Sequence, residues 1–144
     1  MKDIKYTGVW WGMVVAVAIW LLWMALRPGQ VVADELTVLT TPAVTYGISP
    51  YVLIELAGNV VVFVPLGLAM SLALRDHPPT RRLLLAVAAG AGLSMIIELV
   101  QIALPSRSSA ISDFVLNTVG TAIGTLVPAL ITNIQSKMNV RRFQ

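Results

Sequence analysis

The sequence has 144 residues and a net charge of +3; 57% of the residues are hydrophobic, 12% are charged, and the mean hydropathy is +0.81. Since a soluble domain usually has about 25% charged residues, this composition excludes an ordinary soluble globular protein, a disordered chain and a coiled coil. The absence of Cys excludes disulfides and thiolate chemistry, and the single His, His77, excludes a His-rich metal site. We therefore expect one integral membrane domain over residues 1–144, with no metal and no cofactor.

Four stretches of the chain are apolar for long enough to cross a bilayer as helices, which takes about 20 residues. Their apolar runs are continuous and do not alternate with polar residues, and this pattern favours helices over strands. The sequence therefore predicts an all-α fold, a polytopic membrane bundle of four transmembrane helices with an outer loop at residues 27–50. The predicted spans are residues 8–26, 51–74, 83–104 and 114–135.

Lysine and arginine are distributed unevenly between the two sides of these spans. Eight of the ten lie on one side, whereas Arg27 and Arg107 lie on the other. By the positive-inside rule the side with eight is cytoplasmic, so both termini are predicted to be cytoplasmic and the loops at 27–50 and 105–112 to face outward. The basic excess then reflects topology in a multi-pass protein of the cell membrane, and we expect no nucleic-acid partner. The eight residues are Lys2, Lys5, Arg75, Arg81, Arg82, Lys137, Arg141 and Arg142.

The first span has an alternative interpretation as a cleaved signal peptide, because a basic start precedes it and Val31-Val32-Ala33 resembles a cleavage site. Its uncharged run of 19 residues is, however, longer than the roughly 7–15 residues of a typical signal peptide. Its four tryptophans are typical of a permanent anchor that places aromatic rings at the membrane interfaces. We therefore expect the first span to remain as a transmembrane helix.

Polar side chains recur at helical spacing in the other three spans. An ionisable group within the hydrocarbon costs roughly 2.5 kcal/mol or more, so each requires a physical reason. At 1.5 Å per residue, the acidic and amide side chains among them all lie within about 12 Å of the outer ends of their helices. We therefore expect them to converge with a loop arginine in one outer-leaflet ligand-binding site. The candidate residues are Glu55, Asn59, Glu98, Gln101, Arg107, Asp113 and Asn117, with Ser94 on the same face as Glu98.

The alternative for these polar residues is a structural role, since polar side chains also hold transmembrane helices together through hydrogen bonds. Arg107 and Asp113 could likewise form only a surface ion pair. Gly120 and Gly124 have the spacing that lets two helices approach closely. Pro65 frees the backbone carbonyl of Val61 and predicts a kink, and the nearby Gly67 favours close packing. Four residues are therefore assigned structural roles: Pro65, Gly67, Gly120 and Gly124.

Three elements of the sequence resemble those of VanZ-like membrane proteins. The segment from Asn59 to Gly67 resembles the pattern N-x-x-x-F-x-P-x-G, and Glu98-Leu-Val-Gln101 resembles E-x-x-Q. The segment from Arg107 to Gly124 resembles the run R…D…N-T-x-G-x-x-x-G that follows in the family. The elements occur in family order and cover roughly residues 55–125.

The resemblance implies a small multi-pass protein of the bacterial cell envelope, in a family whose namesake is associated with resistance to teicoplanin-type glycopeptide antibiotics. The sequence departs from the family pattern in the last loop. Where the family usually has a further Asp after the Arg and an Asp pair at the helix start, this chain has Ala110 and Ser112. Only Asp113 remains, which counts against a role that needs paired loop carboxylates.

Three functions are compatible with these features. The first, which we expect, is a non-enzymatic envelope protein that binds membrane lipids, a lipid-linked cell-wall precursor or a lipoglycopeptide, with a homo-oligomer left open. The second is a membrane-embedded enzyme acting on a lipid head group, with Glu98 as general acid or base and Asp113 as its ionised partner. The third is a transporter, against which the scarcity of polar residues in the inner half of the spans argues.

Overall fold

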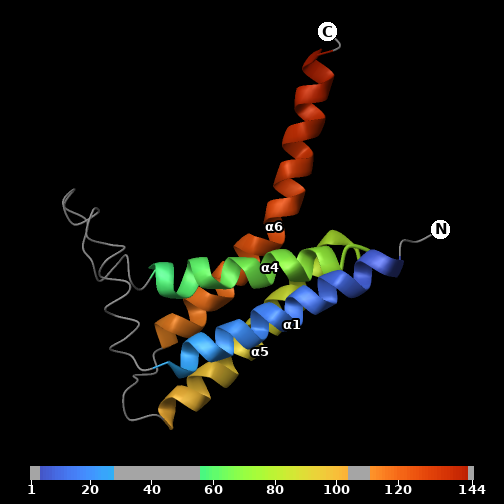
Figure 1. Ribbon diagram of the computed structural model, residues 1–144. Coiled ribbons are helices and arrows are strands. Elements are labelled where there is room, and N and C mark those ends of the chain that lie inside the picture. The colour runs from blue at the N-terminus through green and yellow to red at the C-terminus, as the bar shows by residue number, and fades with distance from the viewer. Residues whose placement is uncertain (1–3, 28–55, 104–110, 143–144) are drawn as a thin grey trace, which may run out of the picture.

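The computed structural model describes residues 4–27, 56–103 and 111–142, and it describes side chains in residues 7–27, 58–103 and 111–131. Every regular element within these ranges is helical, so the predicted all-α fold is confirmed (Figure 1). The elements are α1 (Ile4–Leu26), the π-helix η1 (Leu56–Val61), α4 (Val62–Ala73), α5 (Pro79–Ile102) and α6 (Ile111–Arg142).

Three of the four predicted spans coincide with helices that are long and apolar enough to cross a membrane. These helical stretches are Thr7–Leu26, Pro79–Ile102 and Ile111–Ile131. The remaining span, predicted at residues 51–74, is described only from Leu56 onward, and its apolar helix Gly58–Ala73 is shorter than the other three. Glu55 and most of the predicted outer loop at 27–50 lie outside the described residues.

The helices run in alternating directions along the bundle (Figure 1). The ends of α1 and α5 lie together with the starts of η1 and α6, and we name this the Asp113 end because Asp113 lies in the first turn of α6. The start of α1 lies at the opposite end with the turn between α4 and α5, which we name the Arg75 end. The C-terminal part of α6, red in Figure 1, leaves the bundle.

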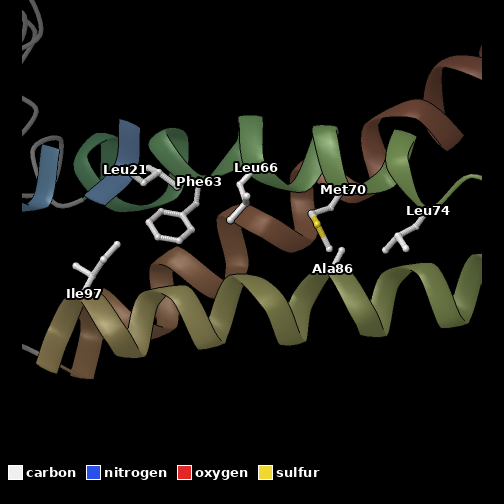
Figure 2. Packing of buried hydrophobic residues seen from close by; sticks show 7 residues of the cluster. All are labelled: Leu21, Phe63, Leu66, Met70, Leu74, Ala86 and Ile97. Carbon is white, nitrogen blue, oxygen red and sulfur yellow. The ribbon is translucent and has the colours of Figure 1, made fainter. Parts of the chain in front are cut away.

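The hydrophobic core lies between α4 and α5, and α1 contributes to it (Figure 2). Phe63, Leu66 and Met70 lie on one face of α4, since they are three and four residues apart. Their side chains point toward α5, as Figure 2 shows. Leu21 of α1 is 2% exposed and belongs to this cluster, so the first span packs as an integral part of the bundle. The complete cluster is Leu21, Phe63, Leu66, Met70, Leu74, Ala86 and Ile97.

Glycines bring α4 and α6 into close contact. A Cβ atom added to Gly67, Gly120 or Gly124 would collide with a backbone carbonyl of the facing helix. Because a Cα–H bond occupies that direction in glycine, each of the three points a Cα–H at a carbonyl, a contact that recurs between closely packed helices. The facing carbonyls belong to Thr121, Val60 and Val64, respectively.

The second predicted span is not a uniform α-helix. Its described part opens with the π-helical turn Leu56–Val61 and continues as α4, with Pro65 inside. Pro65 has no N–H to donate to the carbonyl of Val61, and we assign the irregular turn to this missing hydrogen bond. Single π-helical turns frequently occur at functional sites, and this one contains Asn59.

The bundle has an apolar surface, unlike that of a soluble protein, and its described interior contains polar side chains beside the hydrophobic core. Large apolar side chains on three helices are more than half exposed, such as Val9 at 59%, Leu84 at 64% and Leu130 at 58%. The described interior contains several polar side chains, which in a soluble domain are mostly found outside. This distribution is expected where lipid surrounds the protein, and it agrees with the apolar helices in identifying a membrane protein. The buried polar residues are Ser71, Ser94, Glu98, Gln101, Asn117, Thr121 and Thr125.

Candidate ligand-binding site

The first polar contact at the Asp113 end joins η1 to α6. The Nδ2 atom of Asn59 donates a hydrogen bond of 2.9 Å to Oδ1 of Asp113. The π-helical turn holds Asn59 against α6, and Asp113 lies in the first turn of α6, where the positive end of the helix dipole stabilises a carboxylate. Both side chains are half-buried, so this contact lies at the edge of the bundle interior.

A second polar contact joins α5 to α6 one turn further into the bundle. The Nδ2 atom of Asn117 donates a hydrogen bond of 2.9 Å to Oγ of Ser94. Ser94 is 0% exposed and Asn117 is 3% exposed, so the pair is fully enclosed. Asn117 follows Asp113 by four residues and therefore lies on the same face of α6. The two contacts bring η1, α5 and α6 together along one face of α6.

Glu98 and Gln101 lie on the same face of α5 as Ser94, the face that contacts Asn117 of α6. They follow Ser94 by four and seven residues, which places them on the same side of the helix and closer to the Asp113 end. Glu98 is 9% exposed and Gln101 is 8% exposed. The structure thus brings six polar residues to three adjoining elements, and we name this set the polar cluster. It consists of Asn59, Ser94, Glu98, Gln101, Asp113 and Asn117.

Two residues of the predicted site are not placed. Glu55 and Arg107 lie outside the described residues, so their position relative to the polar cluster stays a prediction. Among the residues that the structure does describe, no three His, Cys, Asp or Glu side chains are grouped as metal ligands would be.

The polar face of α6 extends deeper than the sequence analysis predicted. Thr121 is 0% exposed and its hydroxyl donates to the carbonyl of Asn117 over 3.1 Å. Thr125 is 3% exposed and donates to the carbonyls of Thr121 and Gly67, over 2.8 and 3.3 Å. Asp113, Asn117, Thr121 and Thr125 are spaced by four residues, and this regular spacing is the signal that could have identified the two threonines.

The two threonines have a structural role. Their hydroxyls are bonded to backbone carbonyls of α6 and α4, and Thr121 packs against Gly90 of α5. The groups with chemistry to offer a ligand are therefore concentrated in the polar cluster, which presents two carboxyl groups and three amides. Carboxyl and amide oxygens accept hydrogen bonds, and amide nitrogens donate them, so the cluster is suited to a head group that both donates and accepts.

Comparison with known proteins agrees with the motifs in the sequence. No curated protein and no solved structure matches the chain. The sequence model of the VanZ/LLP1 family matches residues 6–132, a range that contains all four predicted spans except the last three residues of the fourth. The match covers the polar cluster and the glycines of α6, and the resemblance drawn from the motifs is thereby confirmed. The chain belongs to the VanZ/LLP1 family.

Proposed function

We propose that this protein lies in the bacterial cell membrane and binds the head group of an amphiphile through the polar cluster. The observation that carries the proposal is the burial of Glu98 and Gln101 beside two hydrogen-bonded pairs, in a helix bundle whose outer surface is apolar.

Helix association alone does not require this composition. The pairs Asn59–Asp113 and Ser94–Asn117, and the contact of Thr125 with the carbonyl of Gly67, already supply interhelical hydrogen bonds. Such bonds are worth about 0.6–2 kcal/mol each in membranes. Burying a further carboxyl group at Glu98 costs free energy in a lipid environment. An acidic side chain that is retained at such a cost is by default a candidate for a functional role. Ligand binding is a role that requires no catalytic residues, whereas an enzyme would require them.

The distribution of charge supports an orientation in which the polar cluster lies in the outer leaflet. Arg75, Arg81 and Arg82 lie at or beside the turn of the Arg75 end, where α1 also begins. The positive-inside rule assigns that end to the cytoplasm. At the opposite end, the guanidinium of Arg27 lies 5.1 Å from the ring centroid of Trp23, a pairing that suits the membrane–water interface.

An outer-leaflet cluster would meet lipid-linked cell-wall precursors, membrane lipids and the acyl chain of a lipoglycopeptide. The family's association with teicoplanin-type antibiotics makes the last of these relevant to this chain as a proposal. Arg107, which the sequence places in the adjoining loop, would bind a phosphate or carboxylate of the same ligand.

Photo-crosslinking tests the proposal. The full chain, reconstituted in vesicles, is irradiated with a phospholipid that carries a diazirine in its acyl chain near the head group, and the labelled peptides are mapped by mass spectrometry. We expect labelling on η1, α5 and α6 at the Asp113 end, and a reduction of several fold in Glu98→Gln and Arg107→Ala.

The matched control is Asp76→Asn, which makes the same acid-to-amide change in the exposed turn at the Arg75 end and should leave labelling unchanged. Labelling that is uniform along the helices, or indifferent to Glu98→Gln and Arg107→Ala, would contradict the proposal.

A further inference from the structure

One fully buried side-chain atom of the polar cluster has no hydrogen-bond partner among the described residues. Within the part of the chain that the structure describes, Oδ1 of Asn117 is buried and accepts no hydrogen bond, while Nδ2 of the same amide is bonded to Ser94. A buried acceptor without a donor has lost its hydrogen bond to water without replacement, so such atoms are rare in native proteins and need an explanation. A donor that arrives with a ligand would satisfy this atom.

The surroundings of Asn117 indicate which donor this is. The hydrogen bond between Ser94 and Asn117 fixes the register of the antiparallel helices α5 and α6. One turn from this pair, about 6 Å toward the Asp113 end, Glu98 on α5 and Asp113 on α6 are therefore at the same level. Glu98 and Asp113 are the only ionisable residues within 56–74, 83–103 and 111–131, so both charged positions of these helices are acidic.

From this arrangement, and on the basis of the proposed function, we infer that the polar cluster recognises an alkylammonium group in the head group of an amphiphile. An ammonium carries three N–H donors and a positive charge. It can donate to Oδ1 of Asn117 and is attracted by the two acidic side chains one turn away, whereas an ionised phosphodiester has no donor and is repelled by a carboxylate. Asn59 and Asp113 are half-buried and Asn117 is enclosed, so an ammonium entering from the Asp113 end passes the acids first.

Two sources can supply this chemistry: the ethanolamine of a phospholipid and the free amine of a lipid-linked peptide or lipoglycopeptide. A series of lipids with different head groups distinguishes the effect of N–H donors from the effect of positive charge, and it distinguishes the two sources of the amine. The full chain is reconstituted in vesicles that contain equal amounts of phosphatidylethanolamine, phosphatidylcholine and phosphatidylglycerol. The lipids that the protein retains are then quantified by native mass spectrometry. Phosphatidylcholine keeps the positive charge without N–H donors, and phosphatidylglycerol has hydroxyl donors without the charge.

We expect phosphatidylethanolamine to be retained about tenfold more than either of the other lipids, because a hydrogen bond to a charged donor is stronger than one to a neutral donor. Dodecylammonium chloride should displace it, since the ammonium suffices without a phosphate. Displacement of a lipid-linked peptide by dodecylammonium, without preference for phosphatidylethanolamine, would support ammonium recognition and assign the amine to the peptide source.

Variants of Asn117 test whether the preference for phosphatidylethanolamine depends on Oδ1 of this residue. Asn117→Ala should abolish the preference for phosphatidylethanolamine. Asn117→Asp keeps the shape of the side chain and adds a negative charge, so it should increase that preference. Thr118→Val is the control, because it removes a neighbouring hydroxyl that is bonded to the carbonyl of Phe114 within α6. Should Asn117→Ala fail to fold, the Asn117→Asp result and the lipid series still decide.

Equal retention of phosphatidylethanolamine and phosphatidylcholine, together with a failure of dodecylammonium to displace a lipid-linked peptide, would overturn ammonium recognition. A preference that is unchanged in both Asn117 variants would overturn it as well. Either result would leave the proposed function intact if Glu98→Gln still reduces crosslinking to the acyl-chain diazirine. Absence of both crosslinking and retention for every lipid would overturn the proposed function itself.

Discussion

Single glycine residues determine how closely α4 and α6 approach each other. Gly120 and Gly124 face the carbonyls of Val60 and Val64, and no side chain larger than hydrogen fits between them. This spacing also positions Asn59, which is adjacent to Val60, against the first turn of α6. The close approach of the two helices is therefore a precondition for the hydrogen bond between Asn59 and Asp113.

Gly124→Ala tests this packing directly. We expect it to lower the free energy of unfolding by about 1–3 kcal/mol, as other overpacking substitutions do, because the new methyl group meets backbone rather than a flexible side chain. The measurement is unfolding by sodium dodecyl sulfate titration in mixed micelles. Gly92→Ala on α5 is the matched control, since a Cβ at Gly92 meets nothing within 4 Å. Equal stability of the two variants would contradict the packing described above.

The hydrogen bond between Asn59 and Asp113 can be measured by a double-mutant cycle. Replacing Asn59 and Asp113 by Ala, singly and together, should give a coupling energy of about 0.5–2 kcal/mol in the same unfolding assay. Ser112 and Asp113 provide a comparison cycle, because the Ser112 hydroxyl is exposed and 3.5 Å from the Asp113 carboxylate, and we expect little coupling there. Additive effects of the Asn59 and Asp113 substitutions would show that the contact contributes nothing.

At the level of elements, the π-helical turn determines where Asn59 points. A π-helix has more residues per turn than an α-helix, so conversion of Leu56–Val61 to α-helix would rotate Asn59 relative to α4. Pro65 is the residue that favours the irregular turn, because an α-helical register would bring its ring against the carbonyl of Val61.

Pro65→Ala should restore a regular α-helix and move Asn59 away from α6. We expect the variant to be folded, with the coupling between Asn59 and Asp113 lost when the double-mutant cycle is repeated in its background. Pro128→Ala in α6 serves as the control for loss of a helix-interior proline, and it should leave that coupling intact. Persistence of the coupling in Pro65→Ala would show that the π-helical turn does not depend on this proline.

The elements also show what the sequence could and could not predict. Three of the four spans followed from apolar length, and the shared face of Ser94, Glu98 and Gln101 followed from their spacing, because both depend on regular helix geometry. The π-helical turn could not be predicted in this way, since a single wide turn leaves no periodic signal in a continuous apolar run. Thr121 and Thr125 were missed although they continue the four-residue spacing of Asp113 and Asn117. A threonine in a membrane helix can satisfy its hydroxyl on the backbone, so its presence alone does not require burial.

For the whole molecule, the topology determines which leaflet the polar cluster faces. The alternating directions of the helices place the start of α1 and the arginines around the α4–α5 turn at one end, and the start of α6 at the other (Figure 1). The proposed orientation follows from applying the positive-inside rule to this arrangement.

Because the sequence contains no Cys, single cysteines report this orientation without background. A membrane-impermeant maleimide applied to intact cells should label Ser112→Cys at the Asp113 end and leave Asp76→Cys at the Arg75 end unlabelled. Both positions are exposed, so permeabilised cells should show labelling of both. Labelling of Asp76→Cys alone in intact cells would place the polar cluster toward the cytoplasm and contradict the proposed orientation.

The binding of an amphiphile head group by the polar cluster is tested most directly by an experimental structure of the protein in a lipid bilayer that contains phosphatidylethanolamine. We predict head-group density between η1, α5 and α6, with a nitrogen within hydrogen-bond distance of Oδ1 of Asn117 and beside Glu98. A space that is filled by protein side chains, or by a single water bonded to Asn117, would contradict head-group binding at this position.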